Sequence, residues 1–72
     1  MTHTSLLQEI LEVCRGREFN SVEDLSPHIP DASPHVIEAT VIGAIRRGLL
    51  GGRINEQRFL DGPVVTVSYI RG

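Results

Sequence analysis

The sequence predicts one α+β domain over residues 1–72, in which three helices precede a C-terminal β-hairpin. Apolar side chains recur at helical spacing in three segments between residues 6 and 49, and each segment begins at a serine or an asparagine. Residues 64–70, VVTVSYI, are instead rich in β-branched side chains and alternate as a strand does. A chain of 72 residues is near the lower limit for a single hydrophobic core.

The first helix is expected from about Leu6 to Arg15. Ser5 and Gln8 have the spacing of a capping box, in which the serine hydroxyl accepts from a free backbone N–H. Gly16 follows the last apolar position and provides the left-handed residue that ends a helix. A short extended connector comes next, and we expect its Phe19 to fill the core.

The second helix is expected to be short, with about two turns. Two pairs of residues could start it: Asn20 with Glu23, or Ser21 with Asp24. Its buried stripe is Val22, Leu25 and Ile29. Pro27 and Pro30 limit its length, because proline beyond the first turn removes a backbone donor and clashes with the preceding turn.

The third helix is expected to begin after Ser33, an N-cap residue, with Pro34 at the first helical position. It runs to about Arg47, and Gly48 closes it. The core side at 100° per residue is Ile37, Val41, Ala44, Ile45 and Leu49. The opposite face is Val36, Ala39, Thr40, Gly43 and Arg47, with Arg46 on its border.

Two strands complete the predicted fold. The first lies within Gly52 to Leu60, and the second covers residues 64–70. The alternation places Val65, Val67 and Tyr69 on one face of the second strand. The loop around Gln57 to Pro63 is expected to form a wing, with Phe59 packed beneath it.

This order of elements is that of a winged helix, in which the second and third helices form a helix-turn-helix. Residues 19–67 resemble winged-helix domains, and most closely the winged-helix end of PCI domains. The resemblance rests on FNSVEDLSPHIP, HVIEATVIGAIRRGLLGGRINEQ and PVVTV, in which residues 52–55, GRIN, match a glycine–basic–isoleucine strand. PCI domains occur in subunits of large assemblies such as the proteasome lid, so the resemblance also implies a role in protein assembly.

The charge is divided unevenly along the chain. Residues 1–40 hold two arginines against seven carboxylates, a formal charge of −5, and residues 41–72 hold five arginines against two, which gives +3. Arg46, Arg47, Arg53 and Arg58 are expected to form a cationic ridge for phosphate contacts. Thr40 and His35 are the other candidates for contact with double-stranded DNA, so a small DNA-binding transcriptional regulator is the first hypothesis.

The alternative hypothesis is a protein-interaction module. Its candidate interface is the small-residue face of the third helix, made of Val36, Ala39, Thr40 and Gly43, or else the edge of the last strand. Glycine inside a helix costs about 1 kcal/mol relative to alanine, so Gly43 indicates a close approach. The approaching surface is either a partner or a neighbouring helix of the same core. A homodimer is compatible with both hypotheses.

Enzymatic activity is not expected. The single cysteine, Cys14, falls on the apolar face of the first helix, and it shows no metal-ligand spacing with His3, His28 or His35. We therefore expect no cofactor and no metal. No run approaches the roughly 18 apolar residues of a membrane span, and we expect no signal peptide. One cysteine fits a reducing compartment, so a cytoplasmic location is expected.

Overall fold

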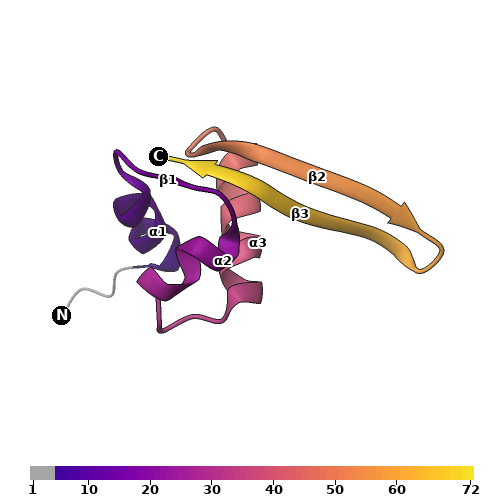
Figure 1. The fold of residues 1–72 in the computed structure, drawn as a ribbon, viewed down its shortest axis with the longest axis horizontal. Coiled ribbons are helices and arrows are strands. Elements are labelled where there is room, and N and C mark those ends of the chain that lie inside the picture. The colour runs from indigo at the N-terminus through magenta and orange to yellow at the C-terminus, as the bar shows by residue number, and fades with distance from the viewer. Residues whose placement is uncertain (1–4) are drawn as a thin grey trace.

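A computed structural model describes residues 5–72 and contains three helices followed by a long β-hairpin (Figure 1). The elements in chain order are α1 (Leu6–Cys14), β1 (Glu18–Phe19), α2 (Val22–Leu25), the 3₁₀ helix η1 (Ser26–His28), α3 (Pro34–Arg46), β2 (Gly51–Phe59) and β3 (Gly62–Arg71). The predicted α+β fold class, a helix-turn-helix core with a hairpin wing, is confirmed. His3 lies outside the described residues.

Three serines start the three α-helices, as local sequence predicts. The hydroxyls of Ser5, Ser21 and Ser33 accept from the backbone N–H three residues later, at 3.2, 3.2 and 3.4 Å. Ser21, and not Asn20, is therefore the cap of α2. Glycines in the left-handed region follow α1 and α3: Gly16 has φ 67° and Gly48 has φ 77°.

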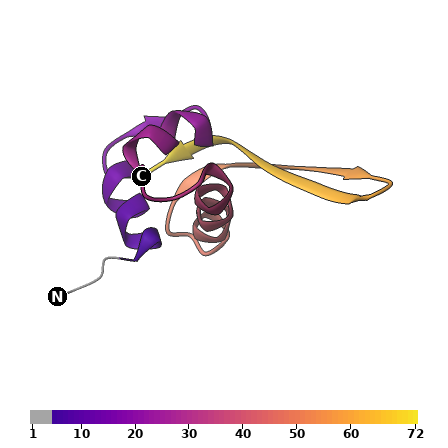
Figure 2. The same cartoon turned by 90° about the horizontal axis from the view of Figure 1, so that it is seen from below.

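The helix-turn-helix is formed by α2 with η1, a turn, and α3. Pro27 lies in η1, where the chain tightens from an α-helix to a 3₁₀ helix instead of continuing. The predicted stripe of Val22, Leu25 and Ile29 is buried. Figure 2 shows α1 and α2 to the left of α3, with the hairpin extending to the right from this group of helices.

The core lies between the three helices and the base of the sheet. Its buried side chains are Ile10, Cys14, Phe19, Val22, Leu25, Ile29, Ile37, Val41, Ala44, Leu50, Val67 and Ile70. The prediction for Leu49 is wrong: it is 45% exposed, and Leu50 is 6% exposed in its place. α3 ends before Gly48, whose left-handed backbone turns the chain out of the helix. The spacing of 100° per residue that placed Leu49 on the core side therefore does not extend to Leu49.

The sheet has three antiparallel strands in the order β1-β3-β2. The register shifts between Arg53, opposite Tyr69, and Ile54, opposite Val67, so Ser68 is an extra residue on β3. This bulge reverses the alternation, and Val67 and Ile70 are both buried although three positions separate them. The predicted alternation that grouped Tyr69 with Val67 is therefore wrong beyond the bulge.

The two predicted strands are confirmed as Gly51–Phe59 and Gly62–Arg71, and the connection between them is shorter than predicted. Pairing continues to Phe59 opposite Gly62, so the turn contains only Leu60 and Asp61 and the predicted loop from Gln57 to Pro63 is wrong. The chain extends 45 × 23 × 22 Å, and both views show the hairpin projecting beyond the helices (Figures 1 and 2). No helix lies beneath its tip, so Phe59 is 57% exposed and the packing predicted for it is wrong.

Candidate nucleic-acid interface

The outer face of α3 is small and open. Val36 is 50% exposed, Ala39 is exposed, and Thr40 and Gly43 are partly exposed. A Cβ added at Gly43 would meet no atom within 4 Å outside its own helix backbone. The core therefore does not require glycine here, which removes the interpretation that Gly43 makes room for a neighbouring helix of the same domain.

Polar groups on this face offer little for reading bases. The Thr40 hydroxyl donates to the Val36 carbonyl at 2.8 Å, so its proton is already used within the helix. His35 is exposed at the second position of α3, away from the arginines at the other end of the helix. Base recognition in a groove favours side chains with several donors or acceptors, such as asparagine, glutamine and arginine.

Three exposed arginines lie where α3 passes into the wing. Arg46 is the last residue of α3, Arg47 is its C-cap, and Arg53 is the third residue of β2. Gly52 is pressed against the last turn of α3, since a Cβ there would lie 2.6 Å from Ile45 Cδ1. This packing holds the start of β2 against the end of α3, so Arg46, Arg47 and Arg53, here called the arginine cluster, flank one junction. Because Gly52 faces α3, the side chain of Arg53 lies on the opposite face of the sheet from the helix.

Arg58 does not extend this cluster. It lies five residues beyond Arg53 on the same strand, a distance of about 17 Å at 3.3 Å per residue. Successive side chains alternate between the faces of a strand, so an odd separation places Arg53 and Arg58 on opposite faces. The expected ridge of four arginines is therefore not continuous: Arg58 lies near the wing tip, apart from the three at the junction of α3 and β2.

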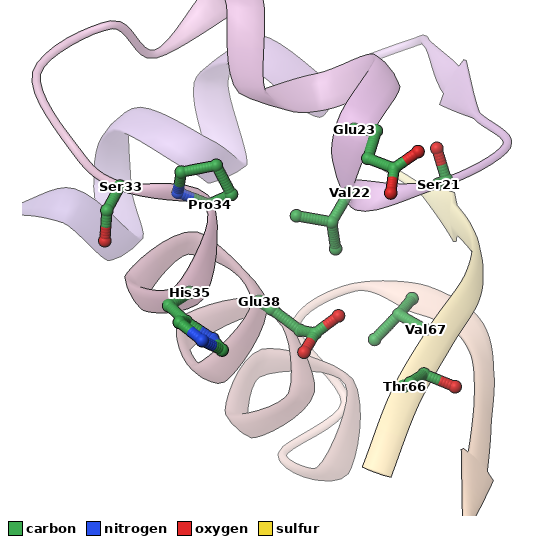
Figure 3. Close-up of a pocket in the computed structure, with 9 residues that line it drawn as sticks. All are labelled: Ser21, Val22, Glu23, Ser33, Pro34, His35, Glu38, Thr66 and Val67. Carbon is green, nitrogen blue, oxygen red and sulfur yellow. The ribbon is translucent and has the colours of Figure 1, made fainter. Parts of the chain in front are cut away.

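A hollow of about 460 Å³ lies at the other end of α3, and the sequence did not reveal it. It is formed by the N-terminal ends of α2 and α3 together with β3 (Figure 3). Val22 and Val67 provide apolar walls, while the carboxylates of Glu23 and Glu38 border it (Figure 3). Two carboxylates thus lie at this end of α3, whereas Arg46 and Arg47 lie at the other end.

The one cysteine of the chain is buried in the core. Burial raises the pKa of the Cys14 thiol, which favours the neutral form at physiological pH. Among residues 5–72, no group of three or more histidine, cysteine, aspartate or glutamate side chains could hold a metal ion. Within the same range, no helix has the length and apolar character needed to cross a membrane.

Comparison with known proteins returns no matching family model, curated protein or solved structure. The arrangement of three helices and a hairpin is compatible with a winged helix. The closer resemblance to PCI domains has no support from these comparisons and stays a prediction.

Proposed function

We propose that this protein is a small, non-enzymatic DNA-binding module that acts in transcription regulation and contacts mainly the phosphate backbone. The observation that carries the proposal is the arginine cluster at the junction of α3 and the wing. Arginine is always charged and its planar fork matches phosphate geometry, so three exposed copies form a suitable phosphate contact.

The surroundings of the cluster favour backbone contact over base reading. The adjoining face of α3 is made of small or apolar residues, which lets a duplex approach without offering the amide side chains that read adenine. The acidic hollow at the N-terminal end of α3 disfavours phosphate there. The duplex would therefore lie toward the C-terminal end of α3 and the base of the wing.

Salt dependence gives the proposal a magnitude. Neutralising three phosphates predicts a slope of about −2.7 for log affinity against log salt concentration. An increase from about 50 to about 200 mM salt would then weaken binding about 40-fold. Removing two of the three contacts would reduce the same effect to about 3.5-fold and weaken binding to every DNA sequence alike.

The test is a titration of the purified protein with a fluorescent random duplex at the two salt concentrations. The variant Arg46→Ala/Arg47→Ala is compared with Arg15→Ala/Arg17→Ala, which removes the same charge from exposed sites in the acidic half of the chain. The proposal expects a large loss in the first variant and a small one in the second. Absent binding at low salt, or equal losses in the two variants, would refute it.

A second candidate function, protein interaction through the small face of α3, is favoured by the open space at Gly43. Leucine at this position would project into solvent from a helix that tolerates it, so Gly43→Leu would leave the fold intact and block a partner that approaches closely. Affinity purification with wild-type protein and Gly43→Leu side by side tests this. A partner retained equally by both proteins would contradict it.

A further inference from the structure

The outer strand of the wing has one free edge. β2 pairs with β3 along Gly51–Phe59 and with no strand on its other side. β3 pairs with β1 only at Ile70 and Arg71, so the edge of the last strand named from the sequence is also unpaired over the rest of the wing. Figure 1 shows β2 as the outermost strand, with no other element beside its far edge. An open edge of this length presents backbone donors and acceptors that another strand could use.

The position of a proline establishes which residues face that edge. Arg58 is opposite Pro63, which has no backbone N–H, so this pair must be a non-hydrogen-bonded pair of the antiparallel ladder. Hydrogen-bonded and non-hydrogen-bonded pairs alternate along such a ladder. The backbone groups of Ile54, Glu56 and Arg58 therefore point away from β3, toward the open edge.

The side chains of β2 are self-complementary about Gln57. When β2 lies antiparallel to a second copy and centred on Gln57, the charges at its outer end meet opposite charges. The opposing strand pairs are Glu56 with Arg58 and Asn55 with Phe59, while Ile54 and Arg53 come level with the turn residues Leu60 and Asp61. Centring the pairing on Glu56 or on Arg58 instead would place like charges directly opposite each other, which destabilises a sheet.

We propose that two copies of this chain associate by antiparallel pairing of β2 with β2, about a twofold axis at Gln57. Glu56 and Arg58 of one copy exchange backbone hydrogen bonds with Arg58 and Glu56 of the other, and their side chains form two opposite-charge pairs. Leu60, which is fully exposed in the single chain, comes level with Ile54 of the second copy. The two sheets join into one sheet of six strands.

Charged residues on an edge strand often serve to prevent pairing, and that is the competing interpretation. The order of the charges favours association, because Glu56 and Arg58 each face an opposite charge in the register centred on Gln57. Phe59 and Leu60 are also exposed at this end of the wing, and exposed apolar side chains beside a free strand edge are a feature of association sites. Self-association of this kind does not depend on DNA binding.

The test is sedimentation velocity over a range of concentrations, with Glu56→Arg and Arg58→Glu as single variants. Each variant places like charges opposite each other twice, so each is expected to weaken the dimer at least about tenfold. An equimolar mixture of the two variants restores opposite charges at both positions and is expected to recover the dimer. Glu23→Arg and Arg15→Glu make the same charge changes on the helical body and are expected to leave association unchanged.

Three results would overturn the proposal: a wild-type protein that stays monomeric up to about 1 mM, a dimer that neither single variant weakens, and a mixture that does not recover it. Hydrogen exchange on the wild-type protein gives a second measurement that needs no variant. The amides of Glu56 and Arg58 should gain protection as concentration rises, while those of Asn55 and Gln57 are already bonded to β3. Unchanged exchange at Glu56 and Arg58 would also overturn it.

Discussion

Replacing Gly52 by alanine tests the packing that places the arginine cluster. The added methyl would lie 2.6 Å from Ile45 Cδ1 and would also meet the Tyr69 carbonyl oxygen, which belongs to the backbone of β3. The isoleucine can rotate, but the strand cannot move without loosening the β2–β3 ladder. Overpacking of this kind costs about 1–3 kcal/mol.

Gly43→Ala is the matched control, because the same methyl meets nothing within 4 Å on a helix. Alanine there is expected to stabilise the protein by about 0.5–1 kcal/mol through helix propensity. The two variants should therefore change stability in opposite directions. For a domain of this size, 1 kcal/mol corresponds to a shift of about 4–8 °C in Tm.

Thermal unfolding followed by circular dichroism measures both variants. Gly52→Ala is expected to unfold at a lower Tm than the wild type, and Gly43→Ala at a higher one. If Gly52→Ala unfolds at the wild-type temperature, β2 is not pressed against α3. The shared location of Arg46, Arg47 and Arg53 would then lose its structural basis.

Three further predictions concern the core, the caps and the thiol. Leu50→Ala should cost about 2–5 kcal/mol, and Leu49→Ala at the exposed neighbour less than about 1 kcal/mol, as measured by urea unfolding; equal costs would contradict the assignment of the core. Ser21→Ala should cost about 1 kcal/mol and Asn20→Ala only a few tenths, because only Ser21 caps α2; a larger loss at Asn20 would move the cap. Burial raises the folded-state pKa of Cys14 above its ordinary 9.0, so the unfolded chain releases the thiol proton first as pH rises. The free energy of unfolding should therefore fall from about pH 9 upward in the wild type but not in Cys14→Ala. The Cys14 thiol should also react with a disulfide reagent only after unfolding.

Local signals in the sequence were sufficient for the helices. Ser5, Ser21 and Ser33 cap their helices through bonds to residues three positions away, and Gly16 and Gly48 end α1 and α3 by their own backbone conformation. Such features depend on neighbouring residues alone, so a reading of the chain in order finds them. The arginines at the end of α3 were identified for the same reason.

Features that depend on distant parts of the chain were missed. The bulge at Ser68 arises from pairing between β2 and β3, and it makes Ile70 a core residue against the simple alternation. The outer part of β2, beyond Asn55, has no helix beneath it and lacks apolar alternation, so part of it was predicted as a loop. The separation of Arg58 from Arg53 follows from the regular pairing of that part with β3. The space around Gly43 is set by residues distant in the sequence, so the structure was needed to show that no core side chain approaches it.

The length of the wing has a consequence for DNA if two copies join as proposed. Pairing centred on Gln57 puts the two Gly51 residues twelve strand positions apart, or about 40 Å. Ile54 and Val67 show that the helices cover the face of the wing that also carries Glu56 and Arg58, so both α3 helices would lie on one side of the joined sheet. One turn of duplex DNA spans about 34–36 Å. The length of the wing would thus set the distance between the two α3 helices of the dimer. Lengthening each strand by two residues would change the spacing of the DNA half-sites that the dimer prefers.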